Sequence, residues 1–105
     1  MWQQFTDLFD FLPISAIIDQ KIFCVHAGLS PSLQNISDIN TQISRVKEIP
    51  HEGPFADLMW SDPEPDVQGF AFSQRGAGYM FGEDIVTKFL HTNDCTRIYR
   101  AHQLC

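Results

Sequence analysis

The sequence predicts a mixed α/β fold, in which short strands form the interior and helices lie outside them. Runs of β-forming residues end abruptly at Gly, Ser and Pro, as at residues 22–31. Segments 1–12 and 83–91 instead carry apolar residues at helical spacing. Strand-like runs outnumber helical ones in the second half of the chain, which favours a layered α/β arrangement over a helical bundle.

The N-terminal part predicts a helix followed by a hairpin. Residues 1–12 form an amphipathic pattern that ends at Pro13, and this helix is expected to cover the core. Residues 15–19 and 21–25 are β-rich runs on either side of Asp19-Gln20, which is a weaker turn signal than Asp-Gly. We therefore expect two antiparallel strands at this point.

The middle of the chain predicts short elements separated by loops. A loop is expected at 27–35, followed by a helix from 37 to 43 that Ser37 caps. Residues 50–54 read as a turn, and 55–59 as one helical turn.

The last third predicts alternating strands and turns around one helix. An acidic surface loop is expected at 64–68, a strand at 69–73 and a glycine turn at 74–78. A helix at 83–91 has acidic residues in its first turn, and a strand follows at 96–100.

Composition excludes several classes of protein. The chain has 105 residues, 44% of them hydrophobic, which fits one small folded domain. Its net charge of −6 argues against a nucleic-acid binder or a protein that docks on anionic membrane. Three cysteines without a CxxC pair indicate neither a disulfide framework nor a zinc ribbon, so a reducing compartment is expected. The first residues lack the pattern of a signal peptide and enter directly on aromatic-rich sequence, so we expect a chain that starts inside a larger domain.

Two histidines follow apolar strands in the same way. His26 comes after 22–25 and His102 after 96–100, and they are too far apart in sequence for a local metal motif. A single histidine at a strand end is usually structural, but two alike favour a shared metal site, since imidazole is the commonest metal ligand. They can meet only where the fold brings the two strand ends together.

Arg75 and Asp62 are the other candidate site residues. Arg75 precedes glycines spaced GxGxxxG, which is neither a dinucleotide fingerprint nor a P-loop. Its planar guanidinium suits a bidentate grip on phosphate oxygens, although a lone arginine in a turn is more often a surface residue. Asp62, in Trp-Ser-Asp-Pro, could support other site residues, bind a metal or form a turn, and an aspartate before proline favours the turn.

Together these residues point to metal-assisted phosphoryl hydrolysis. No GxSxG motif or arguable Cys-His pair supports a covalent nucleophile. Two imidazoles, an arginine and an aspartate suit a site in which a metal activates water and positive groups hold phosphoryl oxygens.

Four ordered motifs carry a family resemblance. They are His26–Pro31 (HAGLSP), Trp60–Pro63 (WSDP), Arg75–Gly82 (RGAGYMFG) and Arg100–Gln103 (RAHQ). With them the chain closely resembles the serine/threonine phosphoprotein phosphatases of the metallophosphoesterase fold. The Arg-Gly-Ala-Gly-Tyr segment and residues 50–54 resemble the type 2A, 4 and 6 branch, and residues 15–26 lean toward type 4.

The resemblance implies a partial calcineurin-like β-sandwich flanked by helices, and a dinuclear-metal hydrolase of phosphoserine and phosphothreonine in proteins. It implies that His26 and His102 bind the second metal, that Arg75 holds the substrate phosphate, and that Asp62 supports them from the active-site wall. The two divalent ions of the complete enzyme are expected to be manganese, or iron and zinc. Expected partners are phosphoprotein substrates and regulatory or scaffold subunits, without nucleic acid or membrane, in the cytoplasm and also the nucleus.

The departures from the family indicate an incomplete catalytic domain. The family segments GDxHG, GDxxDRG and GNHE, which supply the first metal site and the remaining ligands, are absent from the sequence. Residues 1–105 are therefore expected to be the middle-to-late part of the domain, inactive in isolation. The alternatives are a non-catalytic truncated product that binds regulatory subunits and an unrelated small metal-binding domain. Gln20 and Ala27 stand where members of the branch often have glycine.

Overall fold

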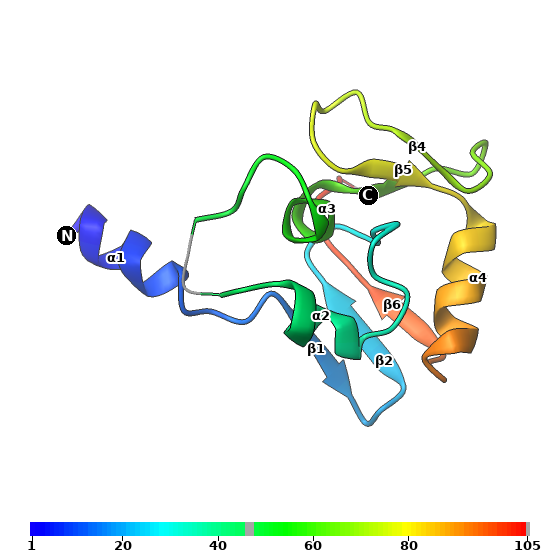
Figure 1. Cartoon of the computed structure of the whole chain (residues 1–105), viewed down its shortest axis with the longest axis horizontal. Coiled ribbons are helices and arrows are strands. Elements are labelled where there is room, and N and C mark those ends of the chain that lie inside the picture. The colour runs from blue at the N-terminus through cyan, green and yellow to red at the C-terminus, as the bar shows by residue number, and fades with distance from the viewer. Residues whose placement is uncertain (46–47, 105) are drawn as a thin grey trace.

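The computed structural model describes residues 1–45 and 48–104, in which four helices accompany two three-stranded sheets (Figure 1). The helices are α1 (Trp2–Phe9), α2 (Ser37–Gln42), α3 (Pro54–Trp60) and α4 (Glu83–Thr92). The strands are β1 (Ser15–Ile18), β2 (Ile22–Val25), β3 (Asp62–Pro63), β4 (Phe70–Phe72), β5 (Tyr79–Phe81) and β6 (Arg97–Tyr99). The α/β fold class is confirmed.

The first sheet has the order β1-β2-β6 and joins the two ends of the chain. β1 and β2 form the predicted antiparallel hairpin. Residues 19–21 join the strands, and the Lys21 amide closes the turn on the Ile18 carbonyl at 3.0 Å. The two central residues of this turn are left-handed, Asp19 with φ 52° and Gln20 with φ 60°. β6 runs parallel to β2, with Phe23 opposite Ile98, so both strands end at the same edge of the sheet.

The second sheet has the order β3-β5-β4. It differs from the sequence prediction at Asp62 and at residues 79–81. Asp62 lies in a strand and does not form a turn, because it pairs in parallel with Met80. Residues 79–81, for which the glycine-rich sequence predicts no strand, are the central strand of this sheet. The Ser61 hydroxyl accepts a hydrogen bond from the Tyr79 amide at 3.0 Å and so aligns the two segments.

An apolar cluster holds the two sheets, helices α2, α3 and α4 and the loop after β2 together. Its buried members are Phe23, Val25, Leu29, Leu33, Ile39, Leu58, Phe81 and Phe89. The Phe23 ring of the first sheet packs against Phe89 of α4, with ring centroids 5.1 Å apart. Phe81 brings the second sheet into the same cluster, so both sheets are fixed against one core.

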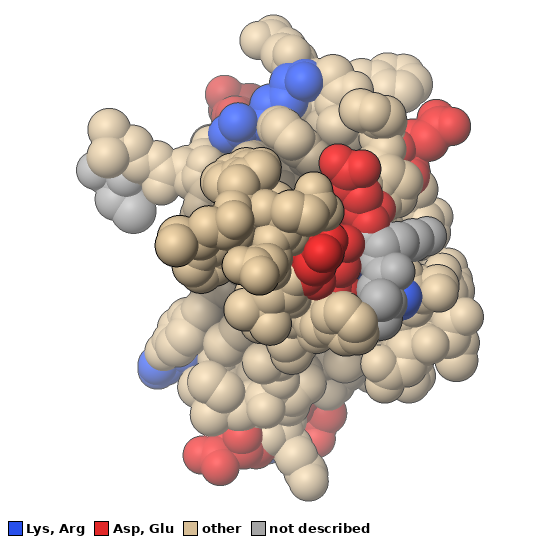
Figure 2. All heavy atoms as spheres, turned by 90° about the vertical axis from the view of Figure 1, so that its left-hand side faces the viewer, with Lys and Arg blue, Asp and Glu red and all other residues tan. Residues whose placement is uncertain are grey.

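The expectation that the N-terminal helix covers the core is wrong for the described residues. α1 has no buried residue and projects from the rest of the chain (Figure 1). Its large apolar side chains, including Trp2 and Phe5, are exposed, and uncharged residues cover much of the face from which it projects (Figure 2). Arg45 instead fixes its C-terminal end, since the guanidinium donates to the carbonyl oxygens of Phe9 and Leu12, each at 2.7 Å.

The predicted capping role of Ser37 is also wrong. The N-cap position of α2 is Ile36, and no side chain caps the helix. The Ile36 amide donates instead to the Asn93 side-chain oxygen at 2.7 Å, while the Asn93 side-chain nitrogen donates to the Gln34 carbonyl at 2.9 Å. A distant asparagine, at the C-terminal end of α4, therefore satisfies this stretch of backbone. No helix among the described residues is long and apolar enough to cross a membrane.

Two glycines allow the packing of the second sheet to be tested. A Cβ at Gly82, which precedes α4, would overlap the Val67 carbonyl oxygen, whereas a Cβ at Gly76 would meet nothing within 4 Å but would sit at φ +85°. We expect Gly82→Ala to lower the free energy of unfolding by about 2–3 kcal/mol through overpacking. Gly76→Ala should lower it by about 1 kcal/mol, through backbone strain alone. Urea unfolding of the two variants measures this difference, and equal losses would contradict the packing described for Gly82.

Candidate functional site

The parallel strands β2 and β6 bring His26 and His102 together. His26 directly follows β2, and His102 lies three residues beyond β6. The Ala101 amide donates to the His26 carbonyl at 3.0 Å and extends the strand pairing to this point. The His26 Nε2 and His102 Nδ1 atoms lie 3.1 Å apart, and the two rings meet at 66°. Residues from opposite ends of the chain thus form one pair of imidazoles.

The spacing of this pair fits two neighbouring ligands of one metal ion. Imidazole nitrogens lie roughly 2.1 Å from a bound zinc ion, so adjacent ligands are about 3 Å apart. The 3.1 Å separation is compatible with that geometry. Among residues 1–45 and 48–104, however, no three His, Cys, Asp or Glu side chains are grouped so that they could hold a metal ion. The pair by itself thus offers two possible ligands, fewer than a complete metal site needs.

The surroundings of His102 favour its neutral form. Burial lowers the pKa of its imidazole, and the positive charge of Arg75 lowers this pKa further, while Asp62 opposes the shift. The Trp60 ring meets His102 edge-on, with centroids 5.8 Å apart. The His102 Nε2 atom is buried and has no hydrogen-bond partner in the part of the chain that the structure describes. Neutral imidazole is the form that binds metals.

Two arginines share the carboxylate of Asp62 beside this pair. Arg75 donates through Nε at 2.5 Å and through Nη2 at 3.5 Å, and Arg100 donates through Nη2 at 2.9 Å. The Asp62 side chain is only 12% exposed, whereas that of Arg75 is 35% exposed. One negative charge is thus matched by two positive ones, so the group carries a net positive charge. Arg75 is therefore held by a buried carboxylate while part of its side chain stays open to solvent.

Arg100 ties the two strand ends to Asp62, a role that sequence patterns did not assign to it. Its Nε donates to the Ala27 carbonyl, its Nη1 to the Gln103 side chain at 2.6 Å and its Nη2 to Asp62. Every guanidinium nitrogen is therefore engaged with the protein. The signal that could have identified it is its position two residues before His102, at a strand end that resembles the one before His26.

The loop after His26 is anchored to α3 by a buried polar contact. The Ser30 hydroxyl donates to the Asp57 carboxylate at 2.5 Å, and both residues are buried. The Ala27 amide also donates to the Leu58 carbonyl at 3.0 Å. Burial raises the pKa of Asp57, and the hydrogen bond from Ser30 opposes this shift. No sequence pattern predicted the contact between Ser30 and Asp57.

The four residues singled out from the sequence therefore lie in one region. His26 and His102 are in contact, Arg75 is bound to Asp62, and the charges of Arg75 and Asp62 act on the imidazole of His102. The roles expected for them stay predictions. The structure adds Arg100 as the residue that links the two halves of the site.

Comparison with known proteins identifies relatives along the whole chain. The calcineurin-like phosphoesterase family matches residues 1–105. A putative serine/threonine-protein phosphatase of Schizosaccharomyces pombe is 62% identical over 105 residues, which are all of this chain and 34% of that protein. A protein phosphatase 2A catalytic subunit of Dictyostelium discoideum is 51% identical over 105 residues, all of this chain and 33% of that protein.

A solved structure shares the fold. It is a serine/threonine phosphatase from Saccharomyces cerevisiae described as similar to human phosphatase PP5, with 35% sequence identity and a TM-score of 0.86. The match covers 99% of this chain and 32% of that one. The chain thus spans about a third of the length of the relatives that it matches. The resemblance to serine/threonine phosphatases is confirmed, while the lean toward type 4 stays a prediction.

The raised pKa of Asp57 predicts a pH-dependent cost of burying its carboxylate. In the unfolded chain the Asp57 carboxyl ionises at its ordinary pKa of 3.8, whereas in the folded chain it ionises at a higher pH. As pH rises through this interval the unfolded chain has already lost the proton. The contribution of Asp57 to the free energy of unfolding therefore falls until the pH passes the folded-state pKa. Asp57→Asn cannot ionise. The stability of this variant relative to the parent chain should therefore rise between pH values below 3.8 and neutral pH. Urea unfolding at several pH values measures it, with the exposed Asp66→Asn as the control for losing one charge. A pH-independent difference for Asp57→Asn would contradict the prediction.

Proposed function

The chain belongs to the calcineurin-like phosphoesterase family, and we propose that it forms part of a serine/threonine protein phosphatase that hydrolyses phosphoserine and phosphothreonine in proteins. The observation that carries this proposal is the placement of Arg75. It is held by a buried carboxylate, is partly open to solvent and lies in the same site as two paired histidines. The names of the relatives support the choice of phosphoprotein substrates.

In this proposal Arg75 binds the phosphate of the substrate. Asp62 accepts from Nε and one Nη nitrogen, so the guanidinium is oriented before substrate arrives. The remaining donors of the fork are those suited to two phosphate oxygens. Arg100 fixes Asp62 from the other side and adds positive charge, which offsets the negative charge of the phosphate. Orientation in advance lowers the entropy lost when the phosphate binds.

His26 and His102 would hold one of the metal ions. Members of this family generally use two divalent metal ions, and we propose manganese, or iron and zinc, for this protein. A bound ion would polarise the phosphoryl group and lower the pKa of a coordinated water. In this proposal His26 Nε2 and His102 Nδ1 would be the coordinating atoms, and their separation of 3.1 Å supports that assignment.

We further propose that residues 1–105 are the middle-to-late part of the catalytic domain. The supporting observation is that the matched relatives are about three times as long. The remaining metal ligands would then come from other parts of the complete protein. Regulatory or scaffold subunits as partners, and a location in the cytoplasm and nucleus, belong to the same proposal.

A chimera tests whether these residues support catalysis. Residues 1–105 would replace the matched segment of the Dictyostelium discoideum catalytic subunit, which is 51% identical over this length. We expect manganese-dependent hydrolysis of a phosphothreonine peptide by this chimera. Arg75→Lys should lower kcat/KM by about 100-fold, because lysine does not reproduce the planar fork. His26→Ala should abolish metal-dependent turnover.

The matched control is Arg97→Lys in the same chimera. Arg97 is exposed on β6, and its side chain donates only to the Tyr99 hydroxyl, at 3.4 Å, among the described residues. This variant should keep the parental rate. A folded, metal-loaded chimera without phosphatase activity, or equal losses for Arg75→Lys and Arg97→Lys, would contradict the proposed function.

The 105-residue chain by itself is expected to be inactive as a phosphatase. The paired imidazoles provide two metal ligands, and the described residues offer no group of three. A metal site with two protein ligands binds too weakly to stay loaded during turnover. The measurement is release of phosphate from a phosphothreonine peptide by the purified chain with added manganese. Turnover that disappears in His26→Ala would show that the chain holds a sufficient site.

A further inference from the structure

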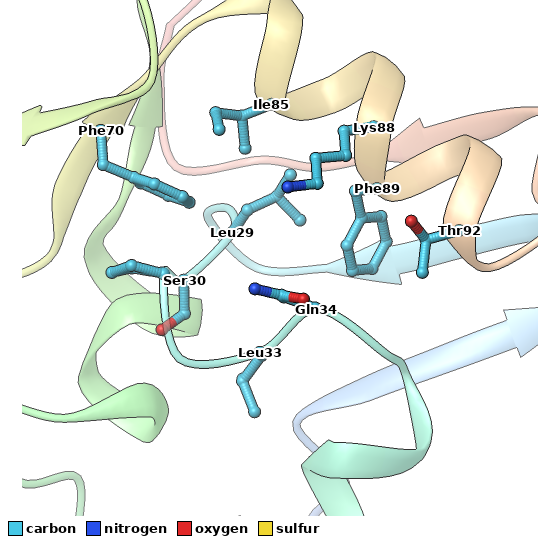
Figure 3. A pocket seen from close by; sticks show the side chains of 10 residues that line it. Leu29, Ser30, Leu33, Gln34, Phe70, Ile85, Lys88, Phe89 and Thr92 are labelled. Carbon is cyan, nitrogen blue, oxygen red and sulfur yellow. The ribbon is translucent and has the colours of Figure 1, made fainter.

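A cavity of about 250 Å³ lies apart from the paired histidines, between α4, the loop after β2 and strand β4 (Figure 3). Its lining residues are Leu29, Ser30, Pro31, Leu33, Gln34, Phe70, Ile85, Lys88, Phe89 and Thr92. None of these is His26, Asp62, Arg75, Arg100 or His102, so the cavity is not part of the phosphate site. The proposed function leaves it unexplained.

Two aromatic rings form opposite parts of its wall. Phe70 enters from β4 and Phe89 from α4 (Figure 3). Both rings are fixed from behind, Phe70 by Tyr79 at a centroid distance of 5.9 Å and Phe89 by Phe23 at 5.1 Å. Because these contacts hold the rings in place, the cavity is formed before any ligand enters. A flat ring between them would make edge-to-face or offset contacts on two sides.

Lys88 gives the cavity a single positive charge. Its side chain extends from α4 across the cavity, and the Gln34 side chain enters the lining from the loop after β2 (Figure 3). No ion pair or hydrogen bond joins the Lys88 amino group to another residue in 1–45 and 48–104. The chain also contains Lys21, but its amino group is paired with Asp94 at 3.2 Å. An unpaired ammonium at an apolar cavity favours a ligand that brings a negative charge.

We propose that this cavity binds a small aromatic monocarboxylate, with its ring between Phe70 and Phe89 and its carboxylate on Lys88. The volume of about 250 Å³ lies just below the range of drug-sized ligand pockets, which begins at roughly 300 Å³, so a single ring with a short acidic arm is the matching size. The two aromatic walls favour a flat ring, and the unpaired amino group of Lys88 favours an acidic group on that ring. Gln34 supplies a neutral donor for the second carboxylate oxygen.

Phenylacetate is the probe for this site, and two smaller changes in the ligand separate its parts. Phenylacetamide keeps the ring and removes the charge, while acetate keeps the charge and removes the ring. Titration of the isotope-labelled 105-residue chain, followed by amide chemical shifts, should show saturable changes in residues 29–34 and 85–92 with phenylacetate. Phenylacetamide should bind more weakly at the same residues, and acetate should give no saturable change there.

Two lysine variants test the role of the charge. Lys88→Met should weaken phenylacetate binding by about three- to ten-fold, the loss of one partly exposed ion pair, and leave phenylacetamide binding unchanged. Lys21→Met removes the same charge from a residue that does not line the cavity and should leave both affinities unchanged. Lys88 is exposed, and methionine favours helices as lysine does, so the variant should keep the amide spectrum of the parent chain.

Three results would overturn the proposal. One is the absence of saturable shifts at the cavity up to about 20 mM phenylacetate, a limit set by the millimolar affinity expected of so small a ligand. A second is equal weakening by Lys88→Met and Lys21→Met, which would indicate a general effect of net charge. The third is equal binding of phenylacetate and phenylacetamide, which would leave the amino group without a role.

Discussion

The parallel pairing of β2 with β6 is the constraint on which the rest of the site depends. It joins segments from opposite ends of the chain, with Cys24 opposite Tyr99, and makes both strands end at one edge of the sheet. His26 and His102 meet there only because of this register. Arg100, the residue that follows β6, then links the two sheets. Its guanidinium donates to the Ala27 carbonyl, beside His26, and to the Asp62 carboxylate in the second sheet. One strand pair thus determines where the two imidazoles lie and, through Arg100 and Asp62, where the Arg75 guanidinium lies.

The charge at this site is opposite to that of the whole chain. The net charge is −6, which alone would disfavour an anionic substrate. Locally, two guanidinium groups face the single carboxylate of Asp62, which is largely buried. Charges beyond about 10 Å are screened at ordinary ionic strength, so an anion at this site would meet the local positive excess more strongly than the net charge of the chain. Burial lowers the pKa of His102 most, and the positive charges of Arg75 and Arg100 lower it further, so the surroundings favour the neutral imidazole.

Sequence patterns predicted the elements whose signals are local. The hairpin around Asp19-Gln20 and the helix now seen at Glu83–Thr92 follow from short periodic runs. The pairing of Asp62 with Met80 escaped prediction, because a parallel ladder is decided by distant partners and an Asp-Pro step reads as a turn. Helix α1 was predicted as an element, but its burial depends on surfaces that the periodicity does not specify. At the site, the motifs drew attention to His26, His102, Arg75 and Asp62, whereas the role of Arg100 required the fold.

The loop that separates the site from the cavity is rigid for identifiable reasons. Gly28 has no room for a Cβ, which would overlap the Phe81 ring and lie 2.9 Å from the Ser61 carbonyl. Ala27 is hydrogen-bonded to the Leu58 carbonyl, and Ser30 to Asp57, so α3 holds the loop on both sides of this glycine. A ligand bound against Leu29 would therefore contact a loop whose backbone is held in place. A packed loop passes a shift from one site to another only when it can adopt a second packed arrangement. Because these contacts tie the loop to α3 and leave no space at Gly28, we expect the cavity and the paired histidines to bind their ligands independently.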